Sequence, residues 1–196
     1  MSMKFAVLIS GGGTNLQALI DAVDAGTIPA SIAVVISDRE DAYGLKRAET
    51  HNIPNAVISR NKFNSKQDRD SKILEVLEQH DVDFIMLAGY LSILSETIVK
   101  KYEKRIINIH PALIPKYSGK GFYGDTIHKA VLENKDVKTG VTLHFVDAGV
   151  DSGPVITQEI IPVFDVDTLE SLKARIHTTE HRLIVETAKN YCEGNI

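Results

Sequence analysis

The residues best suited to chemistry lie at positions 108–111, where Asn108 and His110 precede Pro111. Successive side chains of a strand point to opposite faces, so Asn108 and His110 would share one face with their Cα atoms about 7 Å apart. An amide and an imidazole placed side by side can bind a carbonyl oxygen and move a proton. A strand end whose polar side chains are satisfied by local hydrogen bonds fits the same spacing equally well.

A second candidate site is the run of three glycines at 11–13, followed by Thr14 and Asn15. Glycine lets the backbone approach a ligand closely, and a helix start offers unpaired N–H groups at the positive end of its dipole, an arrangement that suits a phosphate. The alternative is a tight strand–helix connection with Thr14 or Asn15 as the N-cap. Three successive glycines exceed what a cap needs, so we favour an anion site, although the spacing is neither a Walker A loop nor the dinucleotide fingerprint.

A literal G-x-G-x-x-G occurs at Gly119, Gly121 and Gly124. The dinucleotide fingerprint must follow a strand directly, and the two prolines upstream argue against one. The residue after Gly124 is Asp125, where a Walker A motif needs a lysine, and a carboxylate would repel a phosphate. We therefore interpret residues 119–124 as a flexible loop near a site.

His177, Glu180 and His181 form an H-x-x-E-H pattern, which occurs in some zinc peptidases. A catalytic zinc site usually needs a third protein ligand, and only the last residues of the chain remain after His181. We therefore expect polar side chains on a helix turn and no metal. Residues 151–154 read Asp-Ser-Gly-Pro, a sequence that by itself indicates a turn.

Short apolar runs alternate with helical periodicity along the first part of the chain. The runs 5–9, 32–36, 56–58, 84–88 and 106–109 indicate buried strands, and the stretches 16–23, 41–50 and 73–77 indicate helices. This alternation predicts the α/β class, as a mostly parallel twisted sheet with helices on both faces. The length of 196 residues favours a single domain, 1–196.

The last third of the chain has a different pattern. Residues 141–146 and part of 155–163 alternate with period two, which predicts an antiparallel excursion at one end of the sheet. A final helix is expected to begin near Asp167, which has capping-box spacing to Glu170, and to run to about Cys192.

Composition excludes several classes of protein. The apolar fraction of 43% and charged fraction of 24% are ordinary for a globular domain, and the net charge of −4 includes no concentrated basic run for nucleic-acid binding. Cys192 is the single cysteine, so no intramolecular disulfide or cysteine zinc cluster can form. No stretch approaches the length of a membrane span. We expect a soluble cytoplasmic protein, monomer or homodimer, with no nucleic-acid or membrane partner.

Several segments together resemble the phosphoribosylglycinamide formyltransferases, a family of folate-dependent enzymes with a Rossmann-like formyltransferase fold. The matching segments are 9–17, 87–90, 108–115, 144–156 and 179–181, in the family's order and over essentially the whole chain. The resemblance implies transfer of a formyl group from 10-formyltetrahydrofolate to the amine of glycinamide ribonucleotide, a step of purine biosynthesis, without a metal. It also implies a phosphate-binding half of about residues 1–100 and a folate and catalytic half of about 101–196.

The same resemblance assigns roles to individual residues. Asn108, His110 and Asp151 would be the catalytic trio, with Asp151 raising the pKa of a protonated His110. Those expected to bind the acceptor substrate are Gly12, Gly13, Thr14, Asn15 and Glu180. Those expected to bind the folate, besides Asn108 and Asp151, are Lys66, Leu91, Ser92, Ile93, Leu94, Asp147, Ala148, Gly149 and Val150. Where Ser92 stands, the family often has an arginine.

Other functions remain open at this point. A related formyltransferase with another acceptor, or a formyltetrahydrofolate hydrolase, would use the same trio, although those relatives usually carry an additional domain or lack the phosphate-binding start. A non-catalytic nucleotide-binding regulator would account for residues 11–15 and leave Asn108, His110 and Asp151 without a role.

Overall fold

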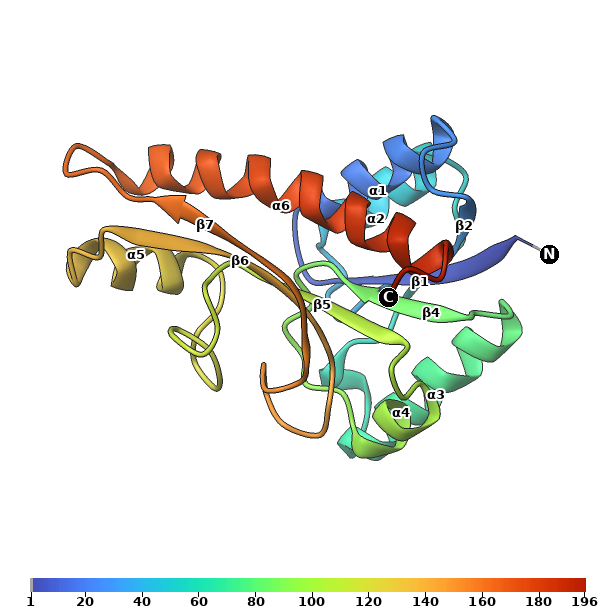
Figure 1. Cartoon of the computed structure of the whole chain (residues 1–196). Helices are drawn as coiled ribbons and strands as arrows, with labels where there is room; N and C mark the ends of the chain where they lie inside the picture. Colours follow the sequence, from blue (N-terminus) through green and yellow to red (C-terminus); the bar gives the residue numbers. More distant parts are fainter. Residues whose placement is uncertain (1) are drawn as a thin grey trace.

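The computed structural model describes residues 2–196, which form one seven-stranded sheet flanked by helices (Figure 1). Its strand order is β3-β2-β1-β4-β5-β6-β7. The strands β1 to β5 pair in parallel, whereas β6 pairs antiparallel with β5 and with β7. The strands are β1 (Met3–Ile9), β2 (Ala30–Ser37), β3 (Asn55–Val57), β4 (Phe84–Leu87), β5 (Ile106–His110), β6 (Lys138–Phe145) and β7 (Val155–Pro162). The predicted parallel sheet with an antiparallel C-terminal part is confirmed.

Helices cover both faces of the parallel strands because the central residues of β1, β2 and β4 are apolar on both faces. In β1, Phe5 and Val7 belong to one buried cluster with side chains of α1, α2 and α6, whereas Ala6 and Leu8 belong to a second cluster with α3 and α4. Figure 1 shows these two layers above and below the sheet. The helices are α1 (Thr14–Asp24), α2 (Tyr43–Thr50), the 3₁₀ turn η1 (Arg60–Lys62), α3 (Lys66–Gln79), α4 (Glu96–Lys101), α5 (Asp125–Glu133) and α6 (Leu169–Cys192).

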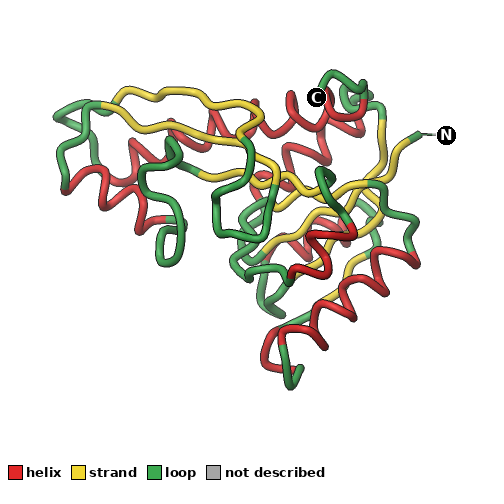
Figure 2. The backbone as a smooth tube through the Cα atoms, turned by 60° about the horizontal axis from the view of Figure 1, so that its bottom comes forward, coloured by secondary structure: helices red, strands yellow, loops and turns green. Residues whose placement is uncertain are grey.

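The antiparallel strands β6 and β7 extend beyond the parallel part of the sheet, as the tube view shows (Figure 2). Helices α5 and α6 pack together, and α6 packs on both of these strands. The loops that join β5 to α5 and β6 to β7 therefore come to lie near the carboxyl end of β5, where the parallel part of the sheet meets the antiparallel part.

Two details of the helices differ from the sequence-based expectations. The final helix is capped one residue later than predicted: Thr168 Oγ1 accepts from the Ser171 N–H and Ser171 Oγ from the Thr168 N–H, at 3.2 and 3.0 Å. Asp167 instead pairs with Arg175 at 2.7 Å. Helices α4 and α5 were not predicted, since each is short and α5 directly follows the glycine-rich loop.

Within residues 2–196, no helix is both long and apolar enough to cross a bilayer. The division into a single domain, 1–196, with two functional halves stays a prediction.

Candidate functional site

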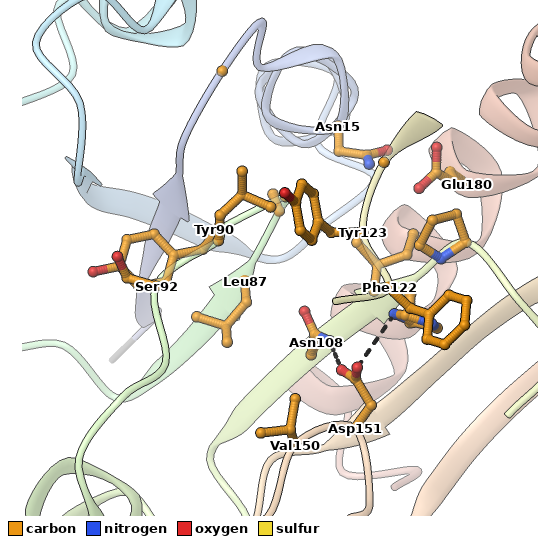
Figure 3. Close-up of a pocket in the computed structure, with 18 of the residues that line it drawn as sticks. Asn15, Leu87, Tyr90, Ser92, Asn108, Phe122, Tyr123, Val150, Asp151 and Glu180 are labelled. Atoms are coloured by element: carbon orange, nitrogen blue, oxygen red, sulfur yellow. Dashed lines mark hydrogen bonds and ion pairs between the residues drawn. The ribbon is translucent and has the colours of Figure 1, made fainter. Parts of the chain in front are cut away.

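A pocket of about 630 Å³ opens at the carboxyl ends of β1, β4 and β5. Open α/β sheets bind ligands at this edge, where successive loops diverge. Its walls come from five segments far apart in the sequence, 11–15, 87–94, 108–111, 119–125 and 144–151, together with side chains of α5 and α6. Figure 3 shows Asn15 and Glu180 at one end of this pocket, Leu87 and Ser92 at the other, and Asn108 and Asp151 between them.

The glycine turn between β1 and α1 is built by close backbone packing. Gly13 is the N-cap of α1, with a left-handed φ of 69° and no side-chain cap, so the expected alternative of a Thr14 or Asn15 cap is wrong. A Cβ on Gly13 would stand 2.7 Å from the Gly44 Cα, which leaves no room for a side chain. Arg47 Nε donates to the Gly12 carbonyl at 2.8 Å and fixes the turn from outside. No side chain caps the start of α1, and residues 13–15 line the pocket, so the first N–H groups of this helix are available to a ligand there.

Next to this turn lies a buried carboxyl group. Glu180 on α6 is 7% exposed, and burial raises its pKa to about 7, although a hydrogen bond from Asn15 opposes the shift. Asn15 Oδ1 is buried without a partner, and His177 Nε2 lies 3.8 Å from Glu180 Oε2. Unpaired buried polar atoms are uncommon in folded proteins, so this end of the pocket is suited to a polar ligand.

The predicted trio converges at the centre of the pocket. Asn108 and His110 project from the same face of β5, as their alternation predicted, and Asp151 reaches them from the loop between β6 and β7. Asn108 Nδ2 donates to Asp151 Oδ1 at 3.3 Å (Figure 3). His110 Nδ1 lies 3.7 Å from Asp151 Oδ2. Asp151 has a left-handed φ of 55°, a strained conformation that turns its carboxylate toward β5.

His144 on β6 fixes the orientation of the Asn108 amide. Its Nδ1 lies 2.9 Å from the Phe145 carbonyl and must donate, so in the neutral ring Nε2 is an acceptor. Asn108 Nδ2 donates to that Nε2 at 3.2 Å. The Nε2 atom and Asp151 Oδ1 are only 3.7 Å apart, so the two N–H groups of the Asn108 amide face two neighbouring acceptors. The amide lines the pocket, where a substrate oxygen would compete with these acceptors for an N–H group.

The pKa of His110 is lower than expected from its carboxylate neighbour. Burial lowers the pKa of His110 below its ordinary value and outweighs the raising effects of Asp151 and the Tyr117 carbonyl; His144 lowers it further. Burial thus works against the protonated His110 that the resemblance implies, because a residue that is 5% exposed loses most of its hydration. Burial also raises the pKa of Asp151, but His144, His110 and the Gly119 N–H together bring it below its usual range.

The apolar wall of the pocket is the loop after β4. Leu91 and Ile93 are about half exposed and line the pocket. Ser92 directs its hydroxyl to Asp38 Oδ2 at 2.6 Å, so it contributes no charge where the family often has an arginine. Behind this wall, Arg69 donates to the Ile93 carbonyl at 2.8 Å, and Asp70, its buried partner, accepts from the Ser95 N–H.

The second wall is the loop 147–151. Asp147 Oδ1 accepts from the Gly149 N–H at 3.0 Å and from Ser152 Oγ at 2.8 Å, which closes the loop on itself. A Cβ at Gly149 would stand 2.0 Å from Ser152 Oγ and would displace that hydroxyl from Asp147. Two expected folate residues do not line the pocket: Ala148 lies on the outside of this loop, and Lys66 is exposed at the first turn of α3.

A comparison with known protein families identifies the family to which this chain belongs. A profile described as formyl transferase matches residues 3–188, nearly the whole chain. The chain belongs to the formyl transferase family.

Individual relatives of this formyl transferase are similar over the same span. Phosphoribosylglycinamide formyltransferase of Haemophilus influenzae is 42% identical over 193 residues, covering 98% of this chain and 89% of its own. The trifunctional purine biosynthetic protein adenosine-3 of Gallus gallus is 45% identical over 180 residues, which are 92% of this chain but 17% of that protein. The crystal structure of glycinamide ribonucleotide transformylase 1 from Symbiobacterium toebii has a TM-score of 0.92 at 40% identity, covering 98% of this chain and 89% of that one.

Several pocket residues of this formyl transferase were not singled out from the sequence. His128 on α5 is buried with its Nδ1 unpaired, and burial lowers its pKa to about 4. Lys173 pairs with Asp125 at 2.5 Å at the mouth of the same region. Phe122 and Tyr123 lie in the loop 119–124, which has the G-x-G-x-x-G spacing but was not expected to bind a dinucleotide. Spacing along the chain carries no signal for these contacts, because they depend on how α5 and α6 pack.

The H-x-x-E-H residues of this formyl transferase lie on α6. The rings of His177 and His181 stack with centroids 6.1 Å apart, and Glu180 turns toward Asn15 (Figure 3). Over residues 2–196, no three His, Cys, Asp or Glu side chains come together in a geometry that could hold a metal ion.

Proposed function

We propose that this formyl transferase moves a formyl group from 10-formyltetrahydrofolate to the primary amine of glycinamide ribonucleotide, in purine biosynthesis. One observation carries the proposal: a single pocket has an anion-binding glycine turn at one end and an apolar wall at the other, with Asn108, His110 and Asp151 between them. A phosphorylated amine and a flat, apolar donor would each find a matching end there. The names of the similar enzymes point to the same reaction.

The polar end suits the acceptor substrate. Backbone N–H groups at Gly12, Gly13 and Thr14, together with the positive end of the α1 dipole, would hold its phosphate. His177 and Lys173 line the same end and add positive charge or hydrogen-bond donors. Glu180, with Asn15 beside it, would contact the ribose or the glycinamide part, and a bound donor there would favour its ionised form.

The apolar end suits the folate. The pterin would lie between Leu91–Leu94 and Asp147–Asp151, where Leu91, Ile93 and Val150 expose apolar surface. Ser92 would act through its backbone, since its hydroxyl is committed to Asp38. Lys66 stands outside the pocket and would meet the negatively charged glutamate tail where the donor leaves the protein.

The central residues would stabilise charge and carry the proton. As the amine attacks the formyl carbon, negative charge develops on the formyl oxygen, and an N–H of the Asn108 amide would donate to it, a contribution typically worth about 3 kcal/mol of barrier. The attacking nitrogen loses a proton to neutral His110 through Asp151, and the folate nitrogen that leaves the carbon takes up a proton. The new C–N bond forms first, and the old C–N bond breaks when the tetrahedral species collapses, so the sum is formyl transfer with no net proton change.

The direct test is a transfer assay with the purified protein. We expect glycinamide ribonucleotide and 10-formyltetrahydrofolate to give tetrahydrofolate, measured by folate absorbance, at a rate that depends on the acceptor. A matched reaction without the acceptor measures hydrolysis. Equal rates with and without the acceptor would assign a hydrolase instead, and binding of both ligands with no turnover would assign a nucleotide-binding regulator.

A further inference from the structure

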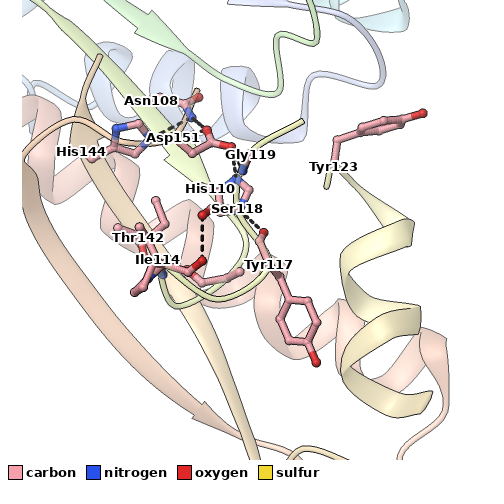
Figure 4. A network of polar contacts seen from close by, with 12 residues as sticks. Asn108, His110, Ile114, Tyr117, Ser118, Gly119, Tyr123, Thr142, His144 and Asp151 are labelled. Carbon is pink, nitrogen blue, oxygen red and sulfur yellow. Dashed lines mark hydrogen bonds and ion pairs between the residues drawn. The ribbon is translucent and has the colours of Figure 1, made fainter. Parts of the chain in front are cut away.

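The backbone carbonyl of Tyr117 contacts the imidazole of His110. It lies 2.7 Å from His110 Nε2, and a carbonyl only accepts hydrogen bonds, so Nε2 must carry the hydrogen. In the neutral ring Nδ1 is then bare, and it is this atom that faces Asp151 Oδ2 at 3.7 Å. Figure 4 shows the Tyr117 carbonyl and Asp151 on opposite sides of the His110 ring. The carbonyl thereby selects one of the two tautomers.

Tyr117 has an unfavourable backbone conformation that needs support. Its φ of 55° lies in the left-handed region, which costs a non-glycine residue about 1–2 kcal/mol. The support comes from the far end of its side chain. The Tyr117 hydroxyl donates to Asp136 Oδ2 at 2.6 Å and accepts from Asn134 Nδ2 at 2.7 Å, just beyond the end of α5. Lys116 Nζ pairs with the other oxygen of Asp136 at 2.6 Å.

The same turn also contacts the carboxylate partner of His110. The Gly119 N–H donates to Asp151 Oδ2 at 3.1 Å, two residues after Tyr117 (Figure 4). One turn thus carries an acceptor for His110 and a donor for Asp151. The tyrosine ring points away from the pocket, toward α5, and is absent from the pocket walls. Tyr117 therefore touches His110 through its backbone alone.

We propose that Tyr117 is a positioning residue for His110. Its ring, fixed by Asn134 and Asp136, holds the backbone carbonyl on His110 Nε2, so that neutral His110 presents its bare Nδ1 to Asp151. The proton lost by the attacking amine then arrives at Nδ1 and completes an ion pair with Asp151, and it later goes to the leaving nitrogen. This assignment rests on the proposed formyl transfer, but the tautomer of His110 can be measured without any substrate.

The test is Tyr117→Phe, which removes the anchoring hydroxyl and keeps the ring. The matched control is Tyr191→Phe, because the Tyr191 hydroxyl also donates to a backbone carbonyl, that of Lys104 at 3.2 Å, far along the chain from the site. Nitrogen-15 NMR of labelled histidine reads the tautomer at pH 8. We expect the Nε2–H form of His110 in the unmodified protein and in Tyr191→Phe, and a substantial Nδ1–H population in Tyr117→Phe. The kcat of Tyr117→Phe should fall about tenfold with little change in either KM.

A second pair of variants keeps the test decisive if Tyr117→Phe fails to fold. Asp136→Ala removes the hydroxyl's acceptor and should give the same tautomer change and the same loss in kcat. Lys116→Met removes the ion pair with Asp136 and the ammonium that lies 4.9 Å from the centre of the Tyr117 ring, but it keeps both hydrogen bonds of the Tyr117 hydroxyl, so it should leave the tautomer as it is. An Nδ1–H form in the unmodified protein, or an unchanged tautomer in both Tyr117→Phe and Asp136→Ala, would overturn the assignment. Absence of transfer by the unmodified protein would instead count against the proposed function, whatever the tautomer.

Discussion

Asp151 is the residue on which the polar contacts of the site converge. Asn108, His110, His144 and the Gly119 N–H all face its two oxygens, within 3.1 to 3.7 Å. The carboxylate is thus kept ionised, and its charge favours the protonated form of His110 against the larger effect of burial. The two effects oppose each other at His110, where burial favours the neutral ring and Asp151 favours the protonated one.

Replacing Asp151 should change the titration of His110. Because Asp151 raises the pKa of His110, Asp151→Asn should lower that pKa further below its ordinary value of about 6.5. The measurement is an NMR titration of His110 in both proteins. If His110 titrates at the same pH in the unmodified protein and in Asp151→Asn, Asp151 does not have this electrostatic role.

Glu180 should make the free energy of unfolding depend on pH. Its pKa in the folded protein is about 7, against an ordinary value of 4.5, so the folded state binds the proton more tightly than the unfolded state. The Glu180 contribution to stability is then fully present below pH 4.5 and is lost as the pH rises through 7, by up to about 3 kcal/mol. Glu180→Gln should abolish this decline in denaturant unfolding at pH 5 and pH 8. Glu186→Gln, at an exposed position of the same helix, should preserve it; a decline that persists in Glu180→Gln would contradict the account.

At the scale of elements, the pocket walls are loops held by rigid neighbours. The glycine turn is held by α2 through Gly44 and Arg47, and the loop after β4 is held by the buried Arg69–Asp70 pair of α3. Each wall therefore depends on a residue that never contacts the pocket itself. Two substitutions with matched controls test this dependence.

Gly13→Ala should damage the phosphate end of the pocket. The left-handed φ costs about 1–2 kcal/mol for alanine, and the new Cβ would meet the Gly44 Cα at 2.7 Å, so α2 or the turn must shift. We expect lower stability and at least tenfold weaker acceptor binding by calorimetry. Gly26→Ala, just beyond the other end of α1, is the control, because its φ of 70° is equally left-handed but its Cβ would meet nothing within 4 Å. Equal acceptor affinity in the two variants would show that the turn does not depend on this packing.

Asp70→Ala should damage the folate end. It leaves Arg69 buried without its partner, a change that usually costs about 3–5 kcal/mol of stability, and frees the Ser95 N–H. The KM for the formyl donor should rise more than the KM for the acceptor. Glu75→Ala breaks an exposed ion pair with Lys72 on the same helix and should change stability by less than about 1 kcal/mol. A rise confined to the acceptor KM would count against this role for the loop.

At the scale of the whole molecule, the succession of strands and helices along the chain could be predicted from the sequence better than the contacts between them. Apolar runs separated by helical periodicity are sufficient to predict β1 to β5, because parallel strands are buried on both faces. The pairing of Asn108 with His144 depends on the register between β5 and β6, which no local pattern encodes. The neutral state of His110 depends on burial that only the packed protein creates. The catalytic role of Asp151 was predicted only from the resemblance to a family, because residues 151–154 by themselves indicate a turn.

The central claim, that Asn108, His110 and Asp151 carry the formyl transfer, is tested most directly by turnover and acceptor binding measured together in His110→Ala and Asp151→Asn. We predict that each variant loses turnover by orders of magnitude while it binds glycinamide ribonucleotide as the unmodified protein does, because the phosphate end of the pocket is unchanged. Turnover in both variants close to that of the unmodified protein would contradict the account.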